Sequence, residues 1–260
     1  MANCTLRCFG VGDGWPCGDR FHSSFLYQIG ASSILIDCGE PLSTSYKASG
    51  LGYDLIDRIF ISHLHSDHVG GFFMFMQGMW LEKRQKPLPI SMPEEGLEPI
   101  QRMLRLSTIY PELLEFDMLF EPIQPLQPVK VGGARVTLFP TTHLDKMRQV
   151  FGAKYGVRLD SYSFLLEGAA LRIVHSADIG KPEDLEPLLQ GRVDVLVCEI
   201  AHFTPEALFT FLHGRDIKRI IFVHVGRAYW ENMPSLRSLA AAMLPHIPHS
   251  FAGDNEQFEL

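Results

Sequence analysis

The chain has 260 residues, of which 46% are hydrophobic, and a formal net charge of −7. This is enough apolar material for a substantial core, and we expect a single domain over residues 1–260 because no linker rich in Ser, Gly or charge interrupts the chain. The only basic cluster is the short segment Lys83–Lys86, whereas proteins that bind long nucleic acids usually carry an extended basic face, so such a partner is disfavoured.

The sequence also argues against export and membrane insertion. The start of the chain, Met1–Arg7, lacks the apolar run of a signal peptide, and the apolar stretch Phe72–Leu81 is too short to cross a bilayer. Five cysteines, an odd number, do not form the disulfide framework of a small secreted protein. We therefore expect a cytoplasmic protein with reduced thiols and no membrane contact.

Short apolar runs alternate with helical patterns along the chain, which favours a layered α/β architecture. The apolar runs predict strands at Thr5–Phe9, Ser24–Ile29, Ser33–Asp37, Arg58–Ile61, Arg135–Phe139, Ser163–Glu167, Leu171–His175, Val193–Cys198 and Arg219–Val223. The helical patterns, several with Pro or an acidic residue in the first turn, predict helices at Gly71–Glu82, Glu94–Arg105, Glu183–Gln190, Pro205–Leu212 and Ser235–Met243.

Residues 63–68, directly after a predicted strand, read His-Leu-His-Ser-Asp-His. Side chains two apart on an extended segment point the same way, so His63 and His65 can share one cation while Asp67 and His68 face a second. Imidazole nitrogen suits zinc, and the added carboxylate leaves manganese and iron as alternatives. A polar loop of solvated histidines would explain any one of these residues, but four ligand-type residues in six positions predict a metal site.

Four more polar residues follow predicted strands: Asp37, His143, Asp178 and His224. Different strands could therefore deliver ligands to one edge of the fold. Taken singly, some have ordinary explanations: Asp37 as a turn residue before Gly39, His143 as a structural histidine, and Asp178 as a helix cap or turn residue.

These residues resemble a known family, the metallo-β-lactamase superfamily, whose signature His-x-His-x-Asp-His is intact at 63–68 and is followed by Val-Gly-Gly. The chain looks most similar to the ribonuclease Z and small phosphodiesterase branch, because Phe9–Gly14 leads through residues 20–24 into a strand and the closing residues 251–260 resemble that branch's terminal strand pair. The resemblance implies a four-layer αββα sandwich, with two sheets packed face to face between outer helices and a dinuclear site on one edge.

Carried over residue by residue, the resemblance implies a complete ligand set: His63, His65 and His143 for a first metal, Asp67, His68 and His224 for a second, and Asp178 as the bridge between them. Two cations about 3.5–4 Å apart can hold and acidify a hydroxide between them, and Asp178 would balance part of their charge. Asp37 matches an aspartate that lies behind the ligands and accepts a hydrogen bond from a metal-bound histidine.

Other residues are candidates for contact with substrate. Residues 199–202 lie where ribonuclease Z has a histidine and a glutamate that assist the leaving group, but Cys198 occupies the histidine position. His202 could replace it, joining Asp67 as a catalytic residue, although it could equally orient a ligand or pack at a helix start. His22 lies on a loop expected to approach the site, and Arg227 and Tyr229 follow His224 as candidate substrate contacts.

The sequence thus predicts an enzyme, a hydrolase with two divalent ions, zinc as the first choice, that cleaves a small nucleotide-like phosphodiester through a metal-bridging hydroxide. The alternatives are a lactone or ester hydrolase of the same fold and a non-catalytic, metal-containing protein that binds a small molecule. Residues 144–161 lack the Gly- and Pro-rich arm of long ribonuclease Z proteins, which argues against transfer-RNA processing. The resemblance also allows a homodimer, since family members often form dimers.

Overall fold

Two seven-stranded sheets pack face to face in the computed structural model, which describes residues 4–260. Residues 1–3 lie outside the described residues. They belong to the expected domain 1–260 and to the segment 1–7, which was predicted not to be a signal peptide. The first sheet has the order β14 (Glu256–Glu259), β1 (Cys4–Gly10), β2 (Ser24–Ile29), β3 (Ser32–Ile36), β4 (Arg58–Phe60), β5 (Leu88–Met92) and β6 (Met118–Pro122). The second has the order β13 (His249–Phe251), β12 (Ile220–Val225), β11 (Val195–Ile200), β10 (Leu171–His175), β9 (Tyr162–Gly168), β8 (Ala134–Pro140) and β7 (Val129–Val131).

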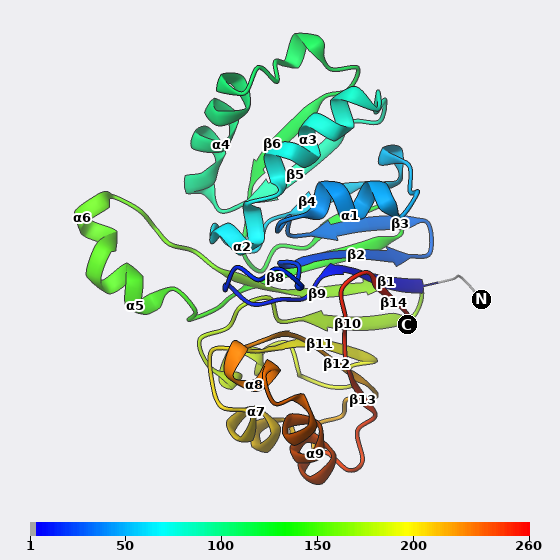
Figure 1. Ribbon diagram of the computed structural model, residues 1–260, viewed down its shortest axis with the longest axis vertical. Helices are drawn as coiled ribbons and strands as arrows, with labels where there is room; N and C mark the ends of the chain where they lie inside the picture. The colour runs from blue at the N-terminus through cyan, green and yellow to red at the C-terminus, as the bar shows by residue number, and fades with distance from the viewer. Residues whose placement is uncertain (1–3) are drawn as a thin grey trace.

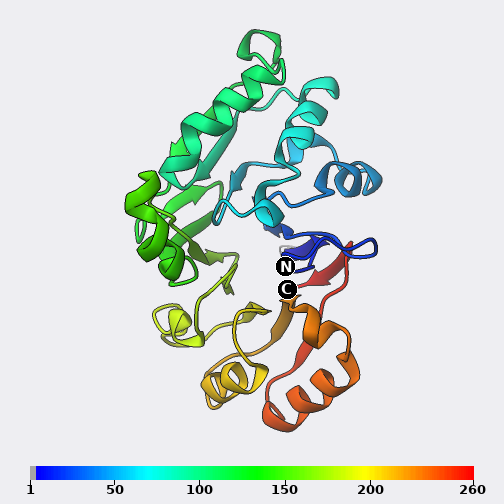
Figure 2. The same ribbon diagram turned by 60° about the vertical axis from the view of Figure 1, so that its left-hand side comes forward.

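Helices cover the outer faces of both sheets (Figures 1 and 2). Over the described residues they are α1 (Leu42–Ala48), α2 (Ser66–Val69), α3 (Phe72–Leu81), α4 (Glu94–Leu106), α5 (Asp145–Met147), α6 (Ala153–Tyr155), α7 (Pro205–Leu212), α8 (Arg227–Trp230) and α9 (Met233–Met243). In Figure 1, α1, α3 and α4 lie with the first sheet, and α7 and α9 with the second.

Each sheet is antiparallel on one side and parallel on the other. Strands β3 to β6 pair in parallel, and so do β10 to β13. Neighbouring parallel strands end at the same edge of their sheet, so the loops that follow them lie close together. This arrangement brings polar loop residues from distant parts of the chain to one edge of the sandwich.

Three apolar clusters hold the layers together. Alternate side chains of a strand point to opposite faces, so Ile34 and Ile36 pack between the sheets while Leu35 packs under α1 and α3. The second sheet repeats this pattern, with Ile221 in the central cluster and Phe222 against α7 and α9. Burying one such side chain contributes about 1.5–3 kcal/mol. The four-layer αββα sandwich implied by the resemblance is confirmed.

Two expectations need correction. The predicted helix Glu183–Gln190 is wrong: a 3₁₀ turn spans Pro182–Leu185, and i→i+3 bonds such as Leu188 N to Leu185 O continue it as turns. The buried leucines 185, 188 and 189 have helical spacing, but the side chain of Asp184 is held by neighbouring loops, which fixes a tighter turn. The strand predicted at Val193–Cys198 runs instead over Val195–Ile200.

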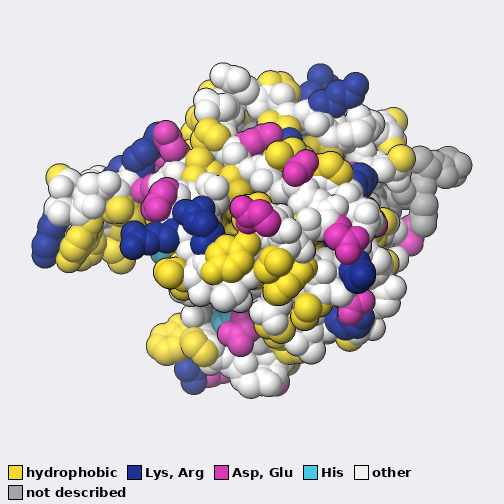
Figure 3. Space-filling view, turned by 90° about the horizontal axis from the view of Figure 1, so that it is seen from above, with side chains coloured by type: hydrophobic (Ala, Val, Ile, Leu, Met, Phe, Trp, Pro, Cys, Tyr) yellow, Lys and Arg dark blue, Asp and Glu magenta, His cyan; other side chains and the backbone are white. Residues whose placement is uncertain are grey.

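Residues 145–155 form a short helical arm that projects from the body of the molecule (Figure 1). The sequence of this arm is not rich in Gly and Pro, unlike the arm of long ribonuclease Z proteins, but the segment still projects from the body of the molecule. It exposes both apolar and basic side chains, including Phe151 and Lys154 (Figure 3). Within residues 4–260, no helix has the length and apolar character to span a bilayer.

Candidate metal centre

The seven predicted ligands meet where β4, β8, β10 and β12 end. The chain leaves β4 at Phe60 and reaches His63 three residues later, and α2 then begins at Ser66, so Asp67 and His68 lie in its first turn. The ligands from the second sheet are single residues, each in or just after the last residues of a strand. The structure arranges the seven in two groups that share Asp178: His63, His65, His143 and Asp178 in one, and Asp67, His68, Asp178 and His224 in the other.

The distances within the first group suit a shared cation. Oδ2 of Asp178 lies 3.8 Å from Nε2 of His63 and 3.6 Å from Nε2 of His143, too far for hydrogen bonds. Zinc bonds of about 2.0–2.1 Å in tetrahedral geometry would separate two ligand atoms by about 3.4 Å. The spacing is therefore close to what one ion between these atoms requires.

Buried ring nitrogens provide an independent test of the fit. Nε2 of His63 and Nε2 of His68 are buried and make no hydrogen bond. An unsatisfied buried polar atom costs about 1–3 kcal/mol, so a folded protein rarely leaves one without a reason. Both atoms face the cluster, and a divalent cation in each ligand group would satisfy them. The residues present therefore fit a metal centre of two ions.

Asp37 fixes the ring of His68. Its Oδ2 lies 2.7 Å from Nδ1 of His68, and its two oxygens also accept bonds from the backbone and hydroxyl of Ser62. Oγ of Ser62 in turn lies 3.0 Å from Nδ1 of His63. With both Nδ1 atoms engaged from behind, the Nε2 atoms of these two rings point into the centre, which is the arrangement expected for Asp37.

Burial and charge set the protonation of the ligands. Burial lowers the pKa of His63 well below its usual range and that of His143 to about 3, so both rings are neutral and can donate a lone pair. Burial opposes the charged form of His68 as well, but the carboxylates of Asp178 and Asp37 outweigh it and raise its pKa. Asp178 is buried too, yet His224 and His68 hold its pKa well below the usual value, so it stays ionised.

Three of the ten non-glycine residues with positive φ among the described residues lie at this edge. Asp37, Ala177 and His224 have positive φ angles of 62°, 44° and 45°. Residues with side chains seldom adopt this left-handed conformation, which costs about 1–3 kcal/mol. Each of these residues is a ligand, a neighbour of a ligand or the carboxylate behind one, so the strain lies where side chains must turn toward the centre.

His202 lies at the edge of the centre and is held by Glu199. Nδ1 of His202 is 2.9 and 2.8 Å from the two carboxylate oxygens of Glu199, and its Nε2 lies 3.8 Å from Oδ2 of Asp178. Burial opposes protonation, but the hydrogen bond and charge of Glu199 outweigh it and raise the pKa of His202 to about 9. This contact was not predicted from the sequence, although the position of Glu199 three residues before a histidine was the available signal.

Glu199 is itself fully buried and anchors the surrounding backbone. It accepts hydrogen bonds from the amides of Ile179 and Ala201. A second buried carboxylate, Asp184, accepts bonds from the amides of Thr142 and Gly180. These contacts tie together the loops that carry His143, Asp178 and His202, and the sequence analysis missed them.

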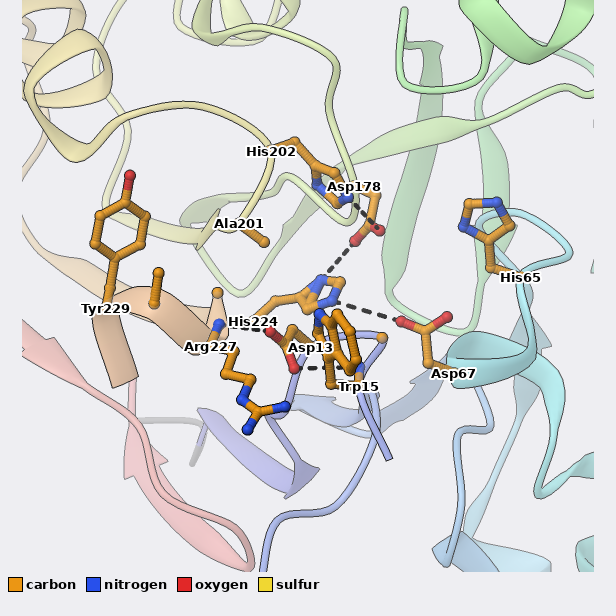
Figure 4. A pocket seen from close by; sticks show the side chains of 13 residues that line it. Asp13, Trp15, His65, Asp67, Asp178, Ala201, His202, His224, Arg227 and Tyr229 are labelled. Carbon is orange, nitrogen blue, oxygen red and sulfur yellow. Dashed lines mark hydrogen bonds and ion pairs between the residues drawn. The ribbon is translucent and has the colours of Figure 1, made fainter. Parts of the chain in front are cut away.

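A cavity of about 550 Å³ opens in front of the second group of ligands. Arg227 and Tyr229 line it, together with Trp15, which the sequence analysis did not single out (Figure 4). His22 is not one of the described residues that line the cavity. Its Nδ1 lies 2.9 Å from the carbonyl oxygen of Asp13. His22 therefore supports the loop that carries Trp15, and the expectation of a direct contact with substrate receives no support from its position.

Comparison with known proteins places this site in a family. A family model described as Anti-Pycsar protein Apyc1 matches residues 4–214. The chain is 29% identical over 185 residues to the Anti-Pycsar protein Apyc1 of Paenibacillus harenae, covering 69% of each protein. It is 31% identical over 141 residues to ribonuclease Z of Methanocaldococcus jannaschii, covering 53% of this chain and 44% of that protein. The matched region thus spans less than half the length of that ribonuclease Z.

The fold has solved counterparts as well. The metallo-β-lactamase fold protein YhfI of Bacillus subtilis superposes with a TM-score of 0.79 at 17% identity, covering 99% of this chain and 100% of that one. At this identity the likeness shows the fold alone. The family match adds the relationship. The resemblance to ribonuclease Z-like proteins with the metallo-β-lactamase fold is confirmed by these relatives and by the fold. The chain belongs to the Anti-Pycsar protein Apyc1 family.

Proposed function

We propose that this protein is a metal-dependent phosphodiesterase that acts on a small, nucleotide-like substrate. The observation that carries the proposal is the pair of ligand groups that share Asp178, directly in front of a cavity of small-molecule size. Relatives named ribonuclease Z and Anti-Pycsar protein Apyc1 support it. A cavity of about 550 Å³ suits a compact substrate better than a long nucleic acid.

The ligand residues would hold two divalent ions, zinc as the first choice. His63, His65 and His143 would bind the first ion, and Asp67, His68 and His224 the second, with Asp178 shared between them. When bound, such ions supply positive charge that stabilises a developing oxyanion, and they acidify a water molecule. The buried carboxylate of Asp178 keeps the ligands of both groups in register and offsets part of that charge.

His202 would act on the leaving group. Glu199 accepts the hydrogen bond from Nδ1 of His202, which turns Nε2 toward Asp178 and the cavity. A proton held on Nε2 can be given to a departing alkoxide, a step that typically contributes roughly 10²–10⁴-fold to a rate. Asp67 also lines the cavity, with its Oδ2 3.5 Å from Nε2 of His224, so it faces the same space as His202.

The deciding experiment compares substrate classes on protein of measured metal content. We expect hydrolysis of bis(p-nitrophenyl) phosphate and of cyclic nucleotides, with turnover lost in Asp178→Ala. An Asp57→Ala variant is a matched control, since Asp57 is a carboxylate of the same chain that bonds to Ser33 and Lys86, away from the ligands. It should hydrolyse the phosphodiesters at the parent rate.

Other outcomes would point to the alternatives. Cleavage of lactones or carboxylic esters without phosphodiester hydrolysis would keep the metal centre and overturn the phosphodiesterase assignment. Metal at about two ions per chain, with no turnover of any class, would favour a binding protein. The homodimer stays a prediction, which light scattering of the purified protein would test.

A further inference from the structure

The rim of the cavity carries an indole that the metal chemistry does not use. Trp15 is 60% exposed, although it is a large apolar side chain, and it lies on the loop between β1 and β2. The same loop approaches the metal centre closely: a Cβ atom added at Gly14 would lie 3.4 Å from Oδ2 of Asp67. The exposed indole therefore belongs to the residue that follows Gly14, whose backbone lies close to the predicted metal ligand Asp67.

A single buried carboxylate holds this rim in place. Oδ1 of Asp13 accepts a hydrogen bond from the amide of Trp15 at 3.3 Å, and Oδ2 accepts one from the amide of Arg227 at 2.7 Å (Figure 4). Asp13 is only 5% exposed, so both contacts are largely shielded from water. The β1–β2 loop is thereby fixed to the start of α8, and the two rim side chains are positioned before a ligand arrives.

The two rim side chains also contact each other. The guanidinium carbon of Arg227 lies 5.3 Å from the centroid of the Trp15 ring, within the range of a cation–π interaction. The indole stays 60% exposed even with this partner, so part of its surface is open to a ligand. A flat aromatic surface with a cation beside it is the chemistry that binds a planar base and a nearby phosphate.

We propose that Trp15, with Arg227 beside it, forms a subsite for the nucleobase of the substrate. The inference rests on the proposed function and deepens it, because it names the part of the substrate that the rim recognises. Every base has a π-face, so a single indole would accept several bases with modest discrimination between them. An aliphatic lactone or ester would gain much less from an open indole beside a charged guanidinium, since it has no ring to stack.

Calorimetric titration with two ligands that differ by the base provides the test. Metal-loaded protein is titrated with adenosine 5′-monophosphate and with ribose 5-phosphate. We expect the parent protein to bind the nucleotide more tightly, and Trp15→Leu to weaken nucleotide binding roughly 5- to 100-fold, with a much smaller change for ribose 5-phosphate. Trp15→Phe keeps a flat ring and should restore most of the affinity, which guards against a folding defect as the explanation.

Tyr110→Leu serves as the matched control, because Tyr110 is an aromatic residue that is 43% exposed and lies outside the cavity lining. It should bind both ligands as the parent does. An unchanged affinity for the nucleotide in Trp15→Leu, or equal losses for both ligands, would overturn the subsite.

Titration needs no turnover, so the subsite and the proposed function can fail separately. A Trp15-dependent preference for the nucleotide in a protein that hydrolyses no phosphodiester would support the subsite and refute the phosphodiesterase. Hydrolysis of cyclic nucleotides with the same kcat/KM in the parent and in Trp15→Leu would support the phosphodiesterase and refute the subsite. If the subsite and the phosphodiesterase function are both correct, the KM for cyclic nucleotides should rise in Trp15→Leu by a larger factor than kcat falls.

Discussion

The two sheets supply the metal centre in different ways. The first sheet provides four ligands within six residues after β4, whereas the second provides single ligands after β8 and β10 and within β12. A contiguous segment can form much of its geometry from local backbone structure. Dispersed ligands meet only when a whole sheet has formed. The first half of the site, His63 to His68, is therefore specified by a local sequence motif. The second half, His143, Asp178 and His224, is assembled only by the fold.

The supporting carboxylates differ in the same way. In the first half, the single residue Asp37 holds both His68 and the backbone of Ser62. In the second half two carboxylates are needed, Glu199 and Asp184, and each binds amides from loops that follow different strands. Ligands that are not neighbours in sequence thus require extra tethers to keep them in register.

The largest predicted effect is the loss of metal when the shared ligand is replaced, compared with the replacement of an unshared ligand. Asp178 belongs to both groups, while His65 belongs only to the first. We expect Asp178→Ala to lose both ions and all detectable turnover, and His65→Ala to keep about one ion per chain, because the second group is intact. Elemental analysis of the purified variants measures this directly. An Asp178→Ala protein with two tightly bound ions would show that the halves do not depend on a common bridge.

The next effect concerns the proton donor. Replacing His202 by Gln should lower kcat by roughly 10²–10⁴-fold for substrates with poor leaving groups, because an alkoxide needs a proton to depart. The loss should be much smaller for p-nitrophenyl esters, whose leaving group is stable as an anion. Glu199→Gln should show the same dependence on leaving group with a smaller loss, since Glu199 positions the ring and does not itself give the proton to the leaving group.

Metal content is the control for these variants, since Asp178, Glu199 and His202 also lie close enough to form a third group of ligand-type atoms. Two ions per chain in His202→Gln would agree with a role in proton transfer. Loss of an ion would identify His202 as a ligand and contradict the proposed role.

A moderate effect is expected at Asp37, the carboxylate that lies behind His68. Asp37→Asn keeps the size of the side chain but removes the charge that holds the Nδ1 proton of His68. Changes behind a metal ligand typically cost 10–100-fold in metal affinity or activity. Competition with a chelator of known affinity measures the change. Asp57→Asn, directly before β4 and bonded to Ser33, should leave the affinity unaltered.

The two halves of the site also differ in how well the sequence predicts them. The segment 63–68 indicated metal binding by itself, because its ligands are adjacent. His143, Asp178 and His224 stood out as polar residues after predicted strands, but only the resemblance to a family made them ligands, since a lone polar residue after a strand has many explanations. The contacts of Glu199, Asp184 and Asp13 were not predicted. Asp13 reaches an amide 214 positions away, and local sequence patterns carry no signal for such a contact.

The smallest predicted effect tests whether the tethers of the second half act on the fold itself. Asp184→Ala would leave the amides of Thr142 and Gly180 without their partner, at a cost of about 1–3 kcal/mol in the free energy of unfolding. Asp184→Asn keeps one carbonyl oxygen that can accept both bonds, so it should cost less than half as much.

Urea denaturation of the metal-free proteins is the appropriate measurement, because bound metal would stabilise the folded state of every variant and hide the difference. If Asp184→Ala were as stable as the parent, the loops of the second half would be held by strand packing alone. If it is less stable and also binds metal more weakly, the tether orders the His143 and Asp178 loops before metal arrives. The dispersed half of the site would then depend on residues that bind neither metal nor substrate.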